Sequence, residues 1–165
     1  MIGANLARMT AWQQFAADAP QIAADVRRRF AASRHHVLAT LRRDGSPRVS
    51  ATELHWRGDQ LELWSMPGSR KALDLRADGR FSVHAQPGDA SPADPDVKLT
   101  GIAAEVTDPR ARRFWIEQES PAGTDSHLFR VDLTEVVTTA VDETEQNLLI
   151  KLWRPERGVV VFRRY

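Results

Sequence analysis

The sequence predicts an α+β protein built on an antiparallel β-barrel, closed or half-closed, with a few flanking helices. After residue 35 the chain alternates short apolar runs with tight turns, which is typical of antiparallel strands. Helical periodicity is confined to short stretches. No long helix alternates with the strands, and no G-x-G-x-x-G links a strand to a helix. A doubly wound parallel sheet is therefore not expected.

Two helices are expected at the N-terminus. Residues 10–18 favour a short helix, and Asp18 and Pro20 resemble a cap followed by proline in the first turn of a second helix. The second helix should extend to about residue 33, because apolar residues recur every four positions at Ile22, Val26 and Phe30.

Strand patterns fill most of the remaining chain. Three strands joined by turns at Asp44-Gly45 and Arg57-Gly58-Asp59 are expected at residues 36–42, 47–56 and 60–66. Five more are expected at 80–85, 97–107, 128–141, 148–153 and 158–163. Short helices should begin at Ser69 and after Asp108, and residues 86–96 form a loop. We expect a single domain over 1–165, with a helical segment at 1–34 and the barrel at 36–165.

Composition limits the classes of function. The 165 residues include no cysteine, which removes disulfides, thiolate metal sites and thiol nucleophiles. Apolar runs are far shorter than the ~20 residues that a bilayer requires, and the first residues do not resemble a signal peptide. We therefore expect a cytoplasmic protein with no membrane partner. The net charge of +1 does not indicate a nucleic-acid binder.

Basic residues gather at both ends of the chain. Residues 1–48 carry 8 Arg against 3 acidic residues, and residues 148–165 carry 5 basic residues against 1 acidic residue. Two interpretations stay open. The basic residues at the two ends lie in solvated surface loops, or both ends converge on an anionic ligand.

The strongest local motif is the run from Pro67 to Leu75. A strand ends at Pro67-Gly68, and Ser69 can cap a helix whose first turn carries Arg70 and Lys71. A helix N-terminus presents unpaired backbone N–H groups and the positive end of the helix dipole, so phosphate is its usual anionic occupant. The alternative is a capped helix with solvated cations.

A second motif lies on the preceding strand. Side chains alternate along a strand, so Arg48, Ser50 and Thr52 share one face. This face completes a phosphate cradle if it lies beside the Ser69 turn, and it has no functional meaning if it faces solvent.

In their order and spacing, these segments resemble the split-barrel flavoproteins of the pyridoxamine 5′-phosphate oxidase-like superfamily. The matching segments are residues 36–41, 44–47, 48–53, 64–65 and 69–72. A weaker match continues through residues 98–103 and ends around 153–164. The resemblance implies a Greek-key split barrel of six to eight antiparallel strands. It also implies a homodimer with two sites at the subunit interface, and FMN or the deazaflavin coenzyme F420 as cofactor.

The resemblance also implies which residues contact the cofactor. Those expected to face the phosphate are Arg48, Ser69, Arg70 and Lys71. Those expected along the ring are Val49, Ser50 and Thr52. Those expected beside the ribityl chain are Trp64, Ser65 and Met66. Trp153 resembles a tryptophan that the family's dimer partner contributes.

Glu53 departs from the family pattern, because FMN oxidases often have a lysine at this position. A carboxylate beside a phosphate dianion costs energy unless it pairs with a cation. Glu53 therefore points away, bridges to Arg70 or another arginine, or marks a site whose phosphate lies elsewhere. One fewer cation favours F420 over tightly held FMN. The anionic F420 tail would then lie along the arginine-rich second helix, at Arg27, Arg28, Arg29 and Arg34.

The function expected from this resemblance is an oxidoreductase that transfers a hydride or two electrons to a small organic substrate. No residues match the substrate site of the vitamin B6 oxidases, and no catalytic residue is predicted, because the cofactor carries the redox chemistry. The histidines are scattered, so no metal site is expected. Two alternatives stay open: a non-catalytic flavin carrier, and a haem-binding or haem-degrading relative. The haem relative would need an axial histidine, and a buried His84 or His127 would count against it.

Overall fold

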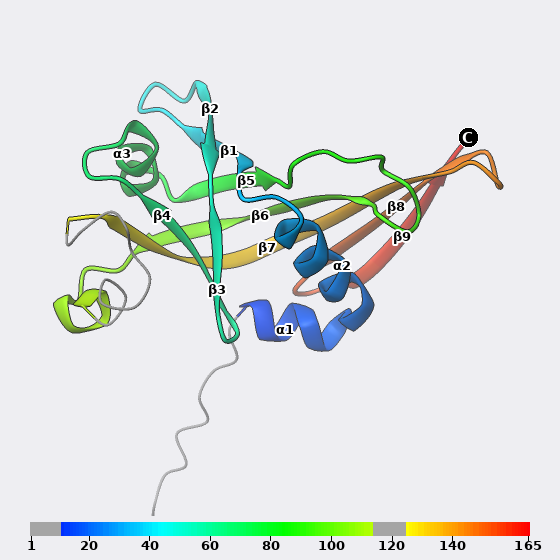
Figure 1. Cartoon of the computed structure of the whole chain (residues 1–165), viewed down its shortest axis with the longest axis horizontal. Coiled ribbons are helices and arrows are strands. Elements are labelled where there is room, and N and C mark those ends of the chain that lie inside the picture. The colour runs from blue at the N-terminus through cyan, green and yellow to red at the C-terminus, as the bar shows by residue number, and fades with distance from the viewer. Residues whose placement is uncertain (1–10, 114–124) are drawn as a thin grey trace, which may run out of the picture.

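The computed structural model describes residues 11–113 and 125–165 (Figure 1). Three helices are α1 (Ala11–Asp18), α2 (Pro20–Ala31) and α3 (Arg70–Ala77). The strands are β1 (His36–Leu41), β2 (Pro47–Thr52), β3 (Leu54–Arg57), β4 (Gln60–Ser65), β5 (Arg80–His84), β6 (Asp96–Glu105), β7 (His127–Asp142), β8 (Asn147–Arg154) and β9 (Gly158–Arg164). The helix expected after Asp108 is present at residues 109–113, and its remainder lies outside the described residues. None of the described helices has the length and apolarity needed to cross a membrane.

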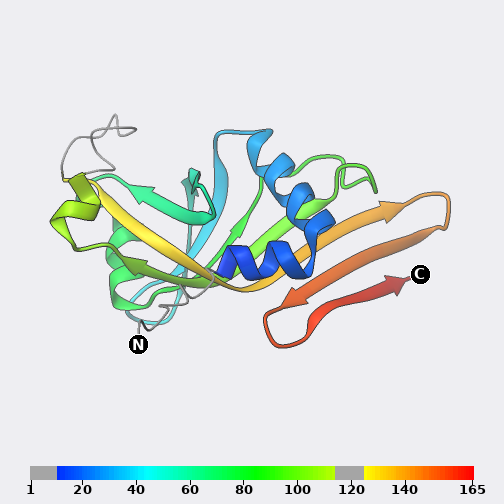
Figure 2. The ribbon, with the colours of Figure 1, turned by 90° about the horizontal axis from the view of Figure 1, so that it is seen from below.

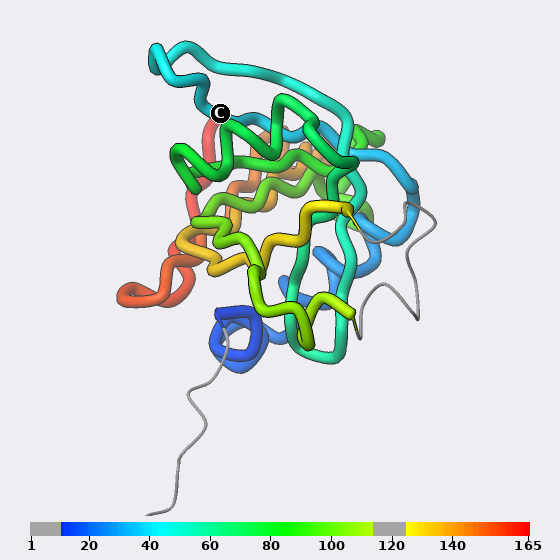
Figure 3. The backbone as a smooth tube through the Cα atoms, turned by 90° about the vertical axis from the view of Figure 1, so that its left-hand side faces the viewer, coloured from blue at the N-terminus to red at the C-terminus, as the bar shows by residue number. Residues whose placement is uncertain are grey.

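The nine strands form one antiparallel sheet, in the order β2-β1-β5-β6-β7-β4-β3, with β8 paired to β7 and β9 paired to β8. β2 and β3 stand at opposite ends of this order, yet only Glu53 separates Thr52 from Leu54. The sheet must therefore curl until its two ends meet at Glu53, which produces an open barrel (Figure 3). The predicted α+β class is confirmed. Nine strands are present rather than six to eight, because the strand expected at 47–56 breaks at Glu53.

The hydrophobic core lies inside the curved sheet and beneath the two N-terminal helices. The largest fully buried apolar side chains from the sheet are Leu38, Leu61, Leu63, Leu99, Phe129 and Trp153. Those from the helices are Trp12, Phe15, Ile22, Val26 and Phe30. The apolar spacing of α2 therefore predicted its buried face correctly.

Asp18 does not cap α2, contrary to the prediction. Ala19 occupies the cap position and makes no side-chain hydrogen bond to the helix. The Asp18 carboxylate instead accepts a hydrogen bond from Trp153 Nε1 at 3.0 Å. The end of α1 is therefore tied to β8, because the buried indole N–H needs an acceptor.

β8 and β9 extend beyond the barrel beside the C-terminal half of β7 (Figure 2). β9 pairs only with β8, and its four consecutive apolar residues are between 37% and 48% exposed: Val159, Val160, Val161 and Phe162. This arm presents an exposed apolar edge strand, the kind of surface that soluble proteins normally cover or charge.

Candidate cofactor site

The turn between β4 and α3 has the conformation that the Pro-Gly-Ser motif predicted. Gly68 has a φ of +68°, a left-handed conformation that glycine adopts without steric cost. Ser69 is the N-cap of α3, and its Oγ accepts a hydrogen bond from Ala72 N at 3.3 Å. Ser65 Oγ and Ser69 Oγ lie 2.5 Å apart, so the two predicted serines are brought together.

The first turn of α3 leaves two backbone donors available. Ser69 N donates to Met66 O, and Ala72 N donates to Ser69 Oγ. The N–H groups of Arg70 and Lys71 have no hydrogen-bond acceptor within residues 11–113 and 125–165. The Arg70 side chain is exposed and makes no ion pair in the same part of the chain. Two amides, one guanidinium and two hydroxyls thus gather at one helix N-terminus, which fits a phosphate.

Lys71 belongs to the same turn but is engaged elsewhere. Its Nζ donates to Ala51 O at 2.6 Å, which ties α3 to β2. Burial lowers the pKa of Lys71, and the neighbouring Glu53 carboxylate opposes this shift only in part. In this arrangement Lys71 contributes a positive charge near the site rather than a direct contact to it.

Arg48, Ser50 and Thr52 share one face of β2, as the alternation predicted, and that face is turned toward the interior and α3. Arg48 Nε donates to Asp74 Oδ2 on α3 at 2.6 Å, and Thr52 is buried. Ser50 Oγ is buried with no hydrogen-bond partner among the described residues. This face of β2 therefore packs against α3 rather than facing solvent alone, and a ligand could supply the hydrogen-bond partner that Ser50 Oγ lacks among the described residues.

Asp74 was not singled out in the sequence, yet it links three elements of the site. Its carboxylate accepts hydrogen bonds from Arg48 Nε and, at 2.8 Å, from Thr40 Oγ on β1. Burial raises the pKa of Asp74, but the hydrogen bonds from Arg48 and Thr40 and the charges of Arg48 and Arg42 outweigh it, so the net pKa is lowered. Asp74 lies one helical turn after Arg70, and this spacing was the only available sequence signal.

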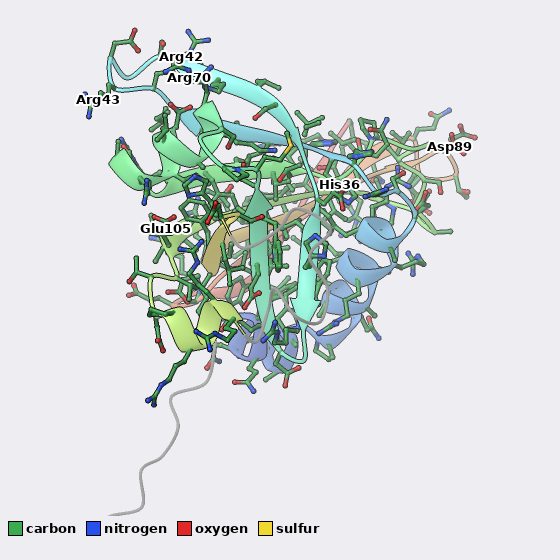
Figure 4. The ribbon with its side chains drawn as sticks, turned by 60° about the vertical axis from the view of Figure 1, so that its left-hand side comes forward. His36, Arg42, Arg43, Arg70, Asp89 and Glu105 are labelled. Atoms are coloured by element: carbon green, nitrogen blue, oxygen red, sulfur yellow. The ribbon has the colours of Figure 1, made fainter. Side chains whose placement is uncertain are left out.

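Val49 and Met66 lie on the surface. Val49 is 68% exposed on the face of β2 opposite Arg48, and Met66 is 70% exposed in the turn. Both side chains are open to a ligand or to a second subunit. The exposed Arg42 and Arg43 lie at the same end of the molecule as Arg70 (Figure 4).

Trp64 and Trp153 lie apart from the turn. Trp64 alternates with Ser65 along β4, so its side chain is on the other face, where it packs against Val106 and Leu128. Trp153 is completely buried in its own chain, with its ring 4.9 Å from that of Phe15. Trp153 is therefore not available to a second subunit, and the role that the resemblance implied for it is wrong.

Glu53 bridges to another arginine, which was one of the three alternatives for this residue. Arg34 Nε donates to Glu53 Oε1 at 2.9 Å. Arg34 follows α2, and the arginines of α2 itself also have partners within the chain, namely Gly58 O for Arg27, Ala93 O for Arg28, and Asp94 with Gln86 O for Arg29. These arginines are held by the chain itself, although the side chains of Arg27, Arg28 and Arg34 remain 43%, 52% and 71% exposed. The preference for F420 over FMN stays a prediction.

Comparison with known proteins identifies the family. The family model described as pyridoxamine 5′-phosphate oxidase matches residues 22–140. No curated protein matches the chain. Two solved structures share the fold at a TM-score of 0.65. One is a pyridoxamine 5′-phosphate oxidase-related, FMN-binding protein from Nostoc punctiforme, with 14% identity over 89% of this chain and 96% of that one. The other is PhzG from Burkholderia lata in complex with tetrahydrophenazine-1-carboxylic acid, with 12% identity over 88% of both chains.

A third solved structure, General Stress Protein 26 from Bacillus anthracis, has 17% identity over 70% of this chain and 91% of that one, with a TM-score of 0.52. At these identities the structural likenesses show a shared fold alone. The family match covers well over half of the sequence, including β1 to β6, α3 and most of β7. The chain belongs to the pyridoxamine 5′-phosphate oxidase family.

Proposed function

We propose that the protein is a flavin-dependent oxidoreductase that binds FMN, with the phosphate at the N-terminus of α3. The observation that carries the proposal is the pair of Arg70 and Lys71 amides without acceptors, beside the exposed Arg70 guanidinium and the Ser65–Ser69 hydroxyls. Hydrogen bonds to a charged group contribute about 1.5–3 kcal/mol each. A few such bonds are enough to anchor a phosphate firmly.

The chain's own residues bind and orient the cofactor. When bound, the flavin supplies hydride or two-electron transfer. Ser65, Ser69 and Arg70 hold the phosphate, and Ser50 Oγ offers one further polar contact on the inner face of β2. The substrate that we propose is a small organic acceptor, whether a conjugated alkene, a quinone or a tetrapyrrole.

FMN is our first candidate because Glu53 does not oppose a phosphate. Its charge is paired with Arg34, and the arginines of α2 are bonded within the chain. F420 is the second candidate, since the exposed Arg42 and Arg43 lie at the same end as Arg70 and could attract an anionic tail (Figure 4).

His127 favours a flavin over haem. It is buried, and both of its ring nitrogens are hydrogen-bonded, Nδ1 with Glu105 and Nε2 with Gly68 N. His127 therefore has no ring nitrogen left for haem iron in this arrangement. His84 does not decide between the two, because its Nδ1 contact with Ala85 O leaves Nε2 outside that contact.

A spectroscopic titration of the purified protein tests the proposal. FMN, F420 and haem are added separately, and the visible spectrum is followed. We expect saturable binding of FMN. Reoxidation of the reduced, bound FMN by a quinone at a rate above that of free reduced FMN distinguishes an enzyme from a carrier. Saturable binding of haem, or of none of the three, would refute the proposed function.

We also propose that two copies associate through the exposed apolar strand β9. Contiguous apolar surface of this kind marks protein–protein contacts, and stable dimers commonly bury about 2,000 Å² or more. Sedimentation should give about twice the chain mass of 18.6 kDa. Val161→Lys should yield monomers, whereas Leu73→Lys, at an equally exposed position on α3, should remain dimeric. A monomeric wild-type protein would refute the association.

A further inference from the structure

A buried imidazole–carboxylate pair lies directly against the proposed phosphate turn. His127, at the start of β7, and Glu105, at the end of β6, both have side chains that are about nine-tenths buried, at 11% and 12% exposure. His127 Nδ1 lies 2.7 Å from Glu105 Oε1. The other ring nitrogen, Nε2, accepts a hydrogen bond from Gly68 N at 3.2 Å.

These two contacts define one protonation state of the ring. Because Nε2 accepts from a backbone N–H, it carries a lone pair, and the proton of the neutral imidazole resides on Nδ1. Nδ1–H then donates to Glu105, and such a partner fixes the tautomer of a histidine. Burial raises the pKa of Glu105, but hydrogen bonds from His127 and Arg76 outweigh it, so the net pKa is lowered and the carboxylate is ionised.

The same carboxylate also holds the far end of α3. Arg76 Nε, in the last turn of the helix, donates to Glu105 Oε2 at 2.5 Å. The pair thus contacts both ends of α3, because His127 bonds to Gly68 just before the helix and Glu105 bonds to Arg76 in its last turn. Figure 4 shows Glu105 on the same side of the molecule as α3. The direction in which the first-turn amides of α3 point is therefore fixed relative to β6 and β7.

We propose that His127 is a positioning residue for the cofactor phosphate. Held by Glu105 as the neutral Nδ1–H tautomer, it fixes Gly68 and thereby directs the Arg70 and Lys71 amides toward the phosphate. His127 does not itself contact the phosphate, because its Nε2 is occupied by Gly68 N. This inference deepens the proposed function and rests on it.

The test begins with the wild-type protein without cofactor. Nitrogen-15 NMR of the His127 imidazole should show the Nδ1–H tautomer. Hydrogen exchange should show that the Gly68 amide is protected. Both measurements need no variant, so the proposal stays testable even if a substitution prevents folding.

Two variants then separate positioning from packing. His127→Phe fills the space but removes the acceptor, so the Gly68 amide should lose protection and FMN affinity should fall about tenfold, as for one lost hydrogen bond. His127→Gln keeps an acceptor oxygen and should restore both. Riboflavin, which lacks the phosphate, should bind equally to all three proteins.

The possible results distinguish this inference from the proposed function. An Nε2–H tautomer in the wild type, or wild-type FMN affinity in His127→Phe, would overturn the role of His127 and leave the proposed function standing. An equal loss of FMN and riboflavin affinity would also overturn it, because the residue would then act on the whole fold. Failure of the wild type to bind FMN would refute the proposed function, and this inference with it.

Discussion

The Asp74→Asn substitution tests how α3 is held against β1 and β2. In the structure the Asp74 carboxylate accepts from Thr40 Oγ at 2.8 Å and from Arg48 Nε at 2.6 Å, and Asp74 is only 8% exposed. Hydrogen bonds to charged groups contribute about 1.5–3 kcal/mol each. Because the Arg48 side chain is one-quarter exposed, water screens its interaction with Asp74 and can replace part of it. We therefore expect the substitution to lower the free energy of unfolding by about 2–3 kcal/mol. For a domain of this size, that loss lowers Tm by about 4–12 °C.

Thermal unfolding followed by circular dichroism measures this loss. Asp89→Asn is the matched control, because Asp89 is an exposed carboxylate with no hydrogen bond or ion pair to the other described residues, and its Tm should stay close to that of the wild type. Folding lowers the pKa of Asp74 below its ordinary value of 3.8. The contribution of Asp74 to the stability of the fold is therefore fully present above pH 3.8 and is lost as the pH falls through the pKa of the folded protein. An unchanged Tm for Asp74→Asn at neutral pH would refute the reasoning.

Three further predictions concern single side chains of the site. Arg70→Ala should weaken FMN binding by about 10- to 100-fold in a fluorescence titration and leave riboflavin binding unchanged. Arg34→Gln removes the arginine partner of Glu53 and should weaken FMN binding, whereas Glu53→Gln in the same protein should restore it. Burial lowers the pKa of Lys71 from 10.5, so the unfolded chain binds more protons between the two values and stability should rise with pH across that window. Lys71→Met should remove this rise in urea unfolding.

The strands of the barrel were predictable because their side chains alternate between core and solvent. The exception is the break at Glu53, where the predicted strand at 47–56 divides into β2 and β3. No glycine or proline marks this break in the sequence. The break arises because the sheet curls, so that β2 pairs with β1 at one end of the sheet and β3 pairs with β4 at the other. Such a corner depends on pairing between distant segments rather than on local pattern.

The turn between β4 and α3 was predictable for the opposite reason, since its proline, glycine and capping serine are all local signals. The side chains around it were not. Trp153 carries no local sign that it is buried against Phe15, and Asp18 resembles a cap although it accepts from Trp153 instead. Glu105 and His127 are 22 residues apart and meet only because β6 pairs with β7.

The central claim is that the N-terminus of α3 binds the phosphate of a flavin. Isothermal titration of the wild-type protein with FMN and with riboflavin measures this directly, because the two ligands differ only in the phosphate. Two amides and one guanidinium should together make FMN bind at least about 100-fold more tightly than riboflavin, and the difference should shrink in Arg70→Ala. Equal affinities for FMN and riboflavin would contradict the account.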